Sequence, residues 1–244
     1  MRFRRNHDPA AELELRLRAA PPLYLRGGRS DFHMFHRIYL RDEYRLNSVG
    51  DGRLSCVIDL GGNVGLFSAR VAPCAERVIV CEPVPENFSQ LQRNTQGFSN
   101  VVALNAAVAA ESGTLRIFLP RTTKRSGSSS AHLQAGHSPE EFHDARALSF
   151  DELLQEQKIS RCDLLKLDVE GSEYEIFHSM SDSAWECIQR IHGEYHDVHP
   201  EDPRTRWENC EQLIRGKGFH VHSLPHRHKV NHGMFFAERV DLKI

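Results

Sequence analysis

The sequence predicts an α/β fold with a mainly parallel sheet, and three observations support this fold class. Short apolar runs rich in β-branched residues recur without strict alternation, as is typical of buried parallel strands. Helical patterns separate these runs, and the first run, LSCVIDL, leads into a glycine-rich turn. The chain of 244 residues, 40% hydrophobic and 26% charged, suits one large globular domain.

An N-terminal helical extension or cap is expected over residues 1–52, followed by a main domain over residues 53–244. Helices are expected over residues 10–19 and 31–44, separated by a Pro-Pro break. The second of these segments carries apolar residues at helical spacing: Phe32, Phe35, Ile38 and Tyr39. Its apolar face is therefore expected to pack on the main domain.

From Leu54 onward, strands and helices are expected to alternate. Strands are predicted over residues 54–59, 77–82, 100–108 and 111–120, and helices over residues 64–74 and 85–96. A loop insertion rich in Ser, Gly and His is expected at about residues 120–146, and long loops in compact domains are often functional. Its Ser126–Ser130 run is a candidate lid, with a flexible linker as the alternative.

The second half continues the same alternation and then closes with a hairpin. A strand leading into a helix is expected over residues 145–157, core strands over 162–171 and 187–196, and helices near Ser172 and over 203–217. Two short strands, over residues 219–224 and 233–240, flank a turn-like segment. A mainly parallel seven-stranded sheet with an antiparallel C-terminal hairpin follows.

The turn after the first strand reads D-x-G-x-N-x-G and predicts a nucleotide-like ligand. It consists of Asp59, Gly61, Asn63 and Gly65. Glycines let backbone N–H groups approach a ligand while the next helix presents its N-terminus. Glu82 ends the second strand, where a carboxylate can accept hydrogen bonds from both ribose hydroxyls. A helix-capping role for Glu82 is the alternative.

Two further positions are candidates for the same site. Asp59 is expected to meet a cationic ammonium group or to organise the glycine turn through backbone donors. Asn105 and Ala106 end the third strand, where they are candidates for an adenine edge. A packing layer of small residues is the alternative for this pair.

Asp168, Glu194 and His196 are the candidate catalytic residues. Asp168 ends the fourth core strand, and Glu194 and His196 lie two positions apart at the end of the fifth. They are expected at the sheet edge where open α/β folds bind ligands, and each is a candidate general base. The alternative for Glu194 and His196 is that they cap the strand and pair with nearby Arg or backbone groups. Together the three residues offer ligands for a divalent metal such as Mg²⁺, and whether one binds is left open.

The composition favours a small-molecule partner. Lys and Arg number 31 against 33 Asp and Glu, so a net charge near −2 gives no general reason to bind nucleic acid or an anionic membrane. Six cysteines without a C-x-x-C pair indicate a reducing, cytoplasmic setting. No signal peptide or membrane span is expected. A homodimer is left open.

Five segments in this order resemble the FkbM-type S-adenosylmethionine-dependent methyltransferase family: DLGGNVGLFS, CEPVPENFSQLQRN, LNAAVAAESGTLRIF, LSFDELL and LLKLDVEGSEYEIF. The resemblance spans roughly Val57 to Phe177, and its most specific parts are VIDLGGNVG and KLDVEGSE. It implies a Rossmann-like class I methyltransferase fold with S-adenosylmethionine as donor. It also implies O-methylation of a hydroxyl on a small molecule, natural product or sugar.

The resemblance also implies roles for the candidate residues. The motif residues Asp59, Gly61, Asn63 and Gly65 would wrap the methionine end, Glu82 would hold the ribose, Asn105 and Ala106 would approach the adenine, and Asp168 would lie near the transferred methyl.

Two other functions remain as alternatives. The glycine turn and Glu82 also permit a nicotinamide-dependent oxidoreductase, but the Asp59 start opposes it. The closing hairpin opposes it too, because dinucleotide dehydrogenases continue with parallel strands, whereas Rossmann-like methyltransferases end in an antiparallel hairpin. A non-catalytic nucleoside-binding module is the second alternative.

Overall fold

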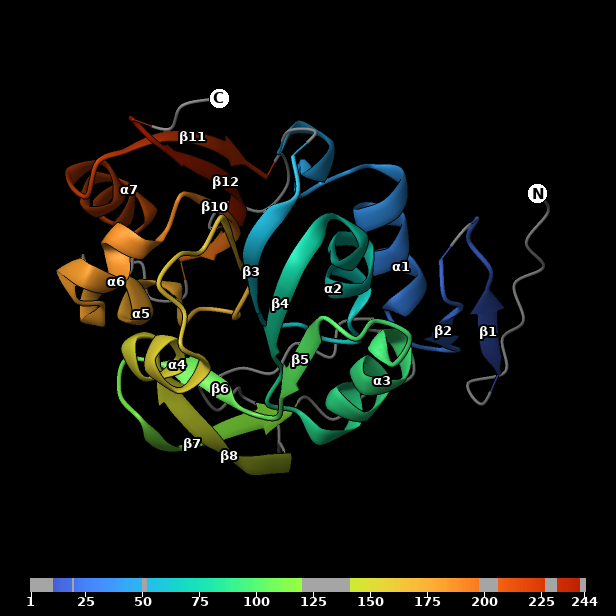
Figure 1. The fold of residues 1–244 in the computed structure, drawn as a ribbon. Helices are drawn as coiled ribbons and strands as arrows, with labels where there is room; N and C mark the ends of the chain where they lie inside the picture. The colour runs from blue at the N-terminus through green and yellow to red at the C-terminus, as the bar shows by residue number, and fades with distance from the viewer. Residues whose placement is uncertain are drawn as a thin grey trace.

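A seven-stranded sheet forms the centre of the protein (Figure 1). The computed structural model describes residues 11–18, 20–49, 52–119, 141–197, 206–226 and 232–241. The sheet has the order β11-β12-β10-β9-β3-β4-β5. Its strands are β3 (Leu54–Leu60), β4 (Ala75–Cys81), β5 (Val101–Leu104), β9 (Leu164–Leu167), β10 (Arg190–His196), β11 (Phe219–Pro225) and β12 (His232–Arg239).

The direction of the strands confirms the predicted architecture. Strands β5, β4, β3, β9 and β10 pair in parallel, whereas β12 lies between β10 and β11 and is antiparallel to both. A dinucleotide-binding sheet would instead carry its sixth strand beside the fifth. Here β12, the last strand, lies between β10 and β11, which are the fifth and sixth strands of the sheet in chain order. This strand order argues against the oxidoreductase alternative.

Helices cover both faces of the sheet and enclose two cores. Apolar side chains from α4 (Phe150–Gln157), α5 (Glu173–Ser179), α6 (Asp182–Cys187) and α7 (Trp207–Gly216) pack on one face. Those from α1 (Asp31–Phe35), the π-helix η1 (His36–Leu40) and α2 (Leu66–Val71) pack on the other, with α3 (Pro85–Thr95) beside α2. Two short 3₁₀ helices complete the set, η2 (Leu46–Ser48) and η3 (Ala72–Cys74). In β3, Ile58 belongs to the first core and Val57 to the second, as expected of a strand buried on both faces.

The prediction of a helix over residues 10–19 is wrong. This segment contains β1 (Glu12–Leu15), which pairs antiparallel with β2 (Leu23–Arg26). The ELEL run alternates with a period of two, so its leucines share one face of a strand. The second predicted helix does begin at Asp31 and continues as the π-helix to Leu40. Its Phe35 and Ile38 share a core with sheet residues, which confirms the expected packing.

The third predicted strand is interrupted at Asn105. Residues 101–104 form β5, whereas β6 (Ala107–Ala109) leaves the central sheet. It joins a separate three-stranded sheet with β7 (Gly113–Leu119) and β8 (Glu141–Ser149), which lies at the lower edge of Figure 1. Residues 141–146 therefore belong to a strand and not to the expected loop. The candidate lid lies outside the described residues.

Within the described part of the chain, no helix has the length and apolar character needed to cross a membrane.

Candidate active site

The glycine turn between β3 and α2 is held against two neighbouring strand ends. Gly61 and Gly65 have φ values of +77° and +78°, which favour glycine. A Cβ atom on Gly61 would lie 1.8 Å from the carbonyl oxygen of Asp168. The N–H groups of Gly61 and Gly62 both donate to the carbonyl of Cys81, at 3.1 and 2.9 Å. No other residue type fits at position 61.

A cavity lies beside this turn, at the carboxyl ends of the strands, with about 700 Å³ of empty space when its open mouth is counted. It is lined by five of the predicted residues, Gly61, Asn63, Glu82, Ala106 and Asp168. The three-stranded sheet of β6, β7 and β8 supplies an apolar wall through Ala107, Val108, Leu115 and Ile117. An apolar wall with a few polar groups at one end suits a nucleoside.

Glu82 is 4% exposed and faces this cavity with a preorganised carboxylate. Its Oε2 accepts a hydrogen bond from the N–H of Asn63 at 2.8 Å, and its Oε1 accepts one from the N–H of Val84 at 2.9 Å. Burial raises the pKa of Glu82 to about 7, although both hydrogen bonds act in the opposite direction. Each oxygen keeps a lone pair, so the carboxylate can accept from two neighbouring hydroxyls. The capping alternative is also partly realised, because Val84 immediately precedes α3.

Asp59 supports the turn from behind and does not line the cavity. Its Oδ2 accepts from the Ser68 hydroxyl at 2.7 Å, and its Oδ1 lies 3.1 Å from Nζ of Lys166. The same ammonium group donates to the carbonyl of Gly61 at 2.7 Å. Asp59 therefore organises the turn through Lys166 and Ser68. The prediction that backbone N–H groups donate to the Asp59 carboxylate is wrong. Lys166, within the KLDVEGSE segment, was missed.

Asn105 and Gly65 also lie outside the cavity lining. The Asn105 amide donates to the carbonyls of Glu82 and Pro83, at 2.8 and 3.1 Å. It therefore braces the end of β4, and its neighbour Ala106 is the one that reaches the cavity. Gly65 packs against Leu91 of α3, where a Cβ atom would have little room.

Tyr44 connects two of the predicted catalytic carboxylates. Its hydroxyl lies 2.9 Å from Oδ2 of Asp168 and 3.1 Å from Oε1 of Glu194, so it donates to one of them at a time. Burial and the nearby Glu194 carboxylate raise the pKa of Asp168. Arg37 donates to both Glu194 and Glu43. Tyr44 and Arg37 come from the N-terminal segment, and no motif marked them in the sequence.

His196 is held by two carboxylates: Glu170 follows β9, and Glu173 is the first residue of α5. Its Nδ1 lies 2.9 Å from Oε1 of Glu173, and its Nε2 lies 3.7 Å from Oε2 of Glu170. Burial opposes a charge on this ring, but Glu173, Asp168 and Glu170 outweigh it and raise the pKa of His196 to about 10. Such a pKa is unfavourable for the predicted role of general base. Neither His196 nor Glu194 lines the cavity.

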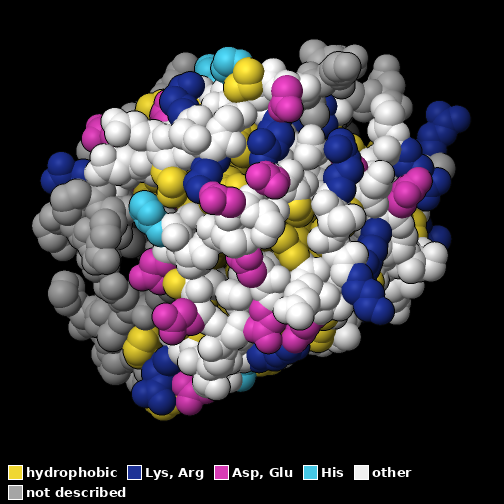
Figure 2. Space-filling view, turned by 60° about the vertical axis from the view of Figure 1, so that its left-hand side comes forward, with side chains coloured by type: hydrophobic (Ala, Val, Ile, Leu, Met, Phe, Trp, Pro, Cys, Tyr) yellow, Lys and Arg dark blue, Asp and Glu magenta, His cyan; other side chains and the backbone are white. Residues whose placement is uncertain are grey.

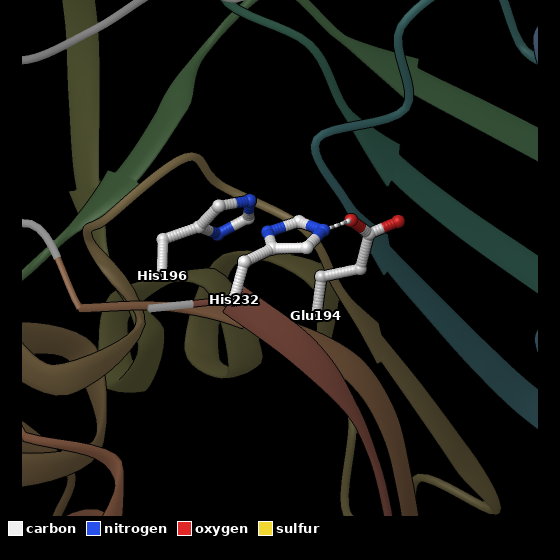
Figure 3. Close-up of side chains that lie close together, drawn as sticks. All are labelled: Glu194, His196 and His232. Carbon is white, nitrogen blue, oxygen red and sulfur yellow. Dashed lines mark ion pairs between the residues drawn. The ribbon is translucent and has the colours of Figure 1, made fainter. Parts of the chain in front are cut away.

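His232 joins Glu194 and His196 in a cluster that the sequence did not predict (Figure 3). Its Nε2 lies 3.2 Å from Oε2 of Glu194, and its ring centre lies 4.6 Å from that of His196. Burial favours the neutral acid, but His232 and Arg37 outweigh it and lower the pKa of Glu194 to about 2.

The predicted metal set Asp168, Glu194 and His196 is divided between two groups that share His196. One group is Glu194, His196 and His232, and the other is Asp168, Glu170 and His196. The potential ligand atoms in each group lie within 4.8 Å of one another.

Comparison with known proteins gives matches to methyltransferases. The family described as methyltransferase FkbM domain matches residues 59–221. Over 213 residues the chain is 27% identical to the 31-O-demethyl-FK506 methyltransferase FkbM of Streptomyces tacrolimicus, covering 76% of this chain and 78% of the relative. Over 196 residues it is 26% identical to the methyltransferase sdnD of Sordaria araneosa, covering 68% and 73% of the two chains.

A solved structure shares the fold at low sequence identity. A putative methyltransferase from Streptococcus mutans, crystallised in complex with SAH, aligns with a TM-score of 0.52 and 9% identity. The alignment covers 82% of this chain and 97% of that one. The α/β architecture predicted from the sequence is thereby confirmed as that of Rossmann-like methyltransferases.

Proposed function

This chain belongs to the methyltransferase FkbM domain family and is an S-adenosylmethionine-dependent methyltransferase, and we propose that its acceptor is a hydroxyl oxygen. The acceptor class is a small molecule, natural product or sugar. The observation that carries this proposal is the position of Asp168, which lines the cavity and receives a hydrogen bond from buried Tyr44. The Streptomyces tacrolimicus relative, named for a 31-O-demethyl compound, adds support for oxygen as the acceptor atom.

The residues around the cavity fit the methyl donor. When bound, S-adenosylmethionine supplies a methyl group activated by its positively charged sulfur. Glu82 presents two carboxylate oxygens to the ribose hydroxyls, and Ala107 and Ile117 offer an apolar wall to the adenine. Gly61 and Asn63 let the backbone of the turn approach the ligand closely.

Asp168 is the residue we assign as the general base. A hydroxyl oxygen that attacks a methyl carbon must give up its proton, and a positioned carboxylate can accept it. Tyr44 holds one oxygen of Asp168 at 2.9 Å, which orients the carboxylate at the cavity wall. Glu194 is the second carboxylate within hydrogen-bond distance of the Tyr44 hydroxyl. Holding the acceptor in line and excluding water supply the rest of the rate enhancement.

Incubation with methyl-labelled S-adenosylmethionine and a panel of hydroxylated small molecules tests this function. We expect a methyl ether as product, identified by mass spectrometry and NMR. Asp168→Asn should lower turnover by about 100-fold or more while leaving the affinity for S-adenosylhomocysteine nearly unchanged. Asp144→Asn, in an exposed ion pair with Arg116, is the matched control. Methylation at nitrogen or carbon, or full turnover by Asp168→Asn, would contradict the proposal.

We also propose that the partner is a small molecule and not a nucleic acid. Acidic and basic side chains are interspersed over the face shown in Figure 2, and the net charge is −2. Such a surface offers a phosphate backbone little electrostatic attraction. A cytoplasmic setting and a homodimer remain predictions from the sequence.

A further inference from the structure

We propose that Glu194, His196 and His232 form a binding site for a divalent transition metal (Figure 3). The proposal rests on the proposed function and deepens it by placing a cation close to Glu170, one of the residues that line the cavity. The site differs from the hard-cation set expected from the sequence, because a second imidazole replaces Asp168 as the third ligand.

The strand register brings the three ligands to one face of the β10–β12 ribbon. Glu194 and His196 are two positions apart in β10, so their side chains leave the strand on the same side. His232 in β12 is the direct antiparallel partner of His196, which places the two rings side by side. The ligand atoms all lie within 4.8 Å of one another, so small side-chain rotations bring them to a common ion.

A buried carboxylate fixes the orientation of His196. Glu173 is 1% exposed, and its Oε1 lies 2.9 Å from Nδ1 of the imidazole. The other oxygen of Glu173 accepts from the N–H of Gly171 at 2.9 Å, which holds the carboxylate in place. Metal-binding histidines in proteins commonly donate one ring N–H to a carboxylate and ligate through the other nitrogen. Because Nδ1 is engaged by Glu173, Nε2 of His196 is the nitrogen available to a metal ion.

The charges around the cluster favour a cation. Among the described residues, the carboxylates of Asp168, Glu170, Glu173 and Glu194 surround the two rings. Arg37 pairs with Glu194 but is shared with Glu43, and Lys166 is occupied by Asp59. Carboxylates thus exceed permanent cations here, and a divalent ion would offset the difference.

The ligand chemistry selects the class of metal and its relation to the acceptor. Two imidazoles and one carboxylate suit iron, cobalt, manganese or zinc better than magnesium. Three protein ligands leave further coordination positions open. Glu170, 3.7 Å from Nε2 of His196, also lines the cavity, so an acceptor oxygen entering there comes near the ion. We assign the metal the role of binding that oxygen.

Titration of the protein with Co²⁺ tests the site, because cobalt bound to imidazole absorbs visible light. We expect saturable binding of one equivalent. His232→Ala and Glu194→Gln should each weaken Co²⁺ affinity by about 100-fold, and Glu173→Gln by about 10- to 100-fold, since outer carboxylates tune metal affinity. His222→Ala, exposed on β11, is the matched control and should bind Co²⁺ normally.

Two comparisons keep this test separate from that of the proposed function. Glu82→Ala should lose affinity for S-adenosylhomocysteine and still bind Co²⁺, whereas His232→Ala should do the reverse. Retained S-adenosylhomocysteine binding by His232→Ala also shows that the variant is folded. The metal site is overturned if the wild-type protein shows no saturable Co²⁺ spectrum. It is equally overturned if His232→Ala and Glu194→Gln bind Co²⁺ as tightly as His222→Ala does.

Discussion

At the scale of single residues, we expect Glu82 to contribute more to cofactor affinity than any other predicted site residue. Its carboxylate is fixed by two backbone N–H groups and faces the cavity. Glu82→Ala removes an acceptor for both ribose hydroxyls and also leaves the N–H of Asn63 unpaired. Because each hydrogen bond to a charged group contributes about 1.5–3 kcal/mol, the loss of one bond should lower S-adenosylhomocysteine affinity by about 10- to 150-fold, and the loss of both should lower it further. Isothermal titration calorimetry measures this change.

Glu86→Ala provides the matched control for that measurement. Glu86 lies in the first turn of the same helix that Glu82 precedes, but its carboxylate pairs with Arg29 at an exposed position. An unchanged affinity is expected for this variant. Equal affinities in the wild type and Glu82→Ala would refute the ribose assignment.

The pKa of Glu82 also predicts how cofactor binding depends on pH. Burial raises this pKa to about 7, and ribose hydroxyls donate to the ionised form. Binding therefore favours the deprotonated carboxylate, so affinity should rise as pH increases through the pKa and then level off. Between about pH 6 and about pH 8 the S-adenosylhomocysteine affinity should increase by about tenfold.

Calorimetry across that range, with Glu82→Gln as the control, measures the effect. Glutamine cannot ionise, so the affinity of the variant should be lower and nearly independent of pH over the same range. A wild-type affinity that falls with pH, or an identical profile in Glu82→Gln, would exclude Glu82 as the titrating group.

At the scale of elements, the glycine turn depends on contacts between strands that are distant in sequence. Gly61 has a φ of +77°, and a Cβ atom there would meet the Asp168 carbonyl at 1.8 Å. Gly61→Ala must therefore strain the backbone and separate the ends of β3 and β9. We expect a loss of about 3 kcal/mol or more in the free energy of unfolding. Cofactor affinity should fall as well, because Gly61 lines the cavity.

Gly216→Ala tests whether this loss is specific to the turn. Gly216 ends α7, and a Cβ atom there meets nothing within 4 Å. The substitution should leave the free energy of unfolding within about 1 kcal/mol of the wild-type value, or increase it slightly. Urea denaturation followed by circular dichroism compares the two variants. A Gly61→Ala protein as stable as Gly216→Ala would contradict the strain argument.

Some of these elements could be predicted because their causes are local. Apolar runs located β3, β4 and β9. A glycine and two carboxylates at strand ends located Gly61, Glu82 and Asp168 in the cavity lining. The ELEL segment was misassigned because four residues carry too little periodicity to separate a strand from a helix. The break at Asn105 was missed because β6 does not continue β5 in the central sheet but pairs with β8, a strand much later in the chain.

The remainder of the site depends on tertiary register. His232 meets Glu194 and His196 only through the pairing of β10 with β12, which follows from the hairpin alignment. The Tyr44 hydroxyl contacts Asp168 from a segment that lies 124 residues earlier in the chain. Neither position has a local signal in the sequence, so neither could be identified before the fold was known.

At the scale of the whole molecule, the N-terminal hairpin is hydrogen-bonded to the rest of the fold, and we expect the two to unfold together. The backbone of Tyr24 in β2 exchanges hydrogen bonds with the side chains of Asn94 and Gln90 of α3, at 2.7 Å for the closest pairs. The Asn94 amide also donates to the carbonyl of Val64 in the glycine turn at 2.7 Å. Asn94 is 1% exposed, so this bridge from the hairpin to the turn lies in the interior.

Leu23→Ala tests this cooperativity against the alternative of a separately folding cap. Leu23 is 1% exposed and shares a core with residues of β3 and α2, so its truncation should cost about 2–5 kcal/mol of unfolding free energy. Leu13→Ala, on the paired strand and 39% exposed, should cost about 0.5 kcal/mol or less. Urea unfolding should show one transition that moves as a whole in Leu23→Ala. If Leu23→Ala instead shifts only a separate early transition while the main one stays in place, the N-terminal segment unfolds on its own.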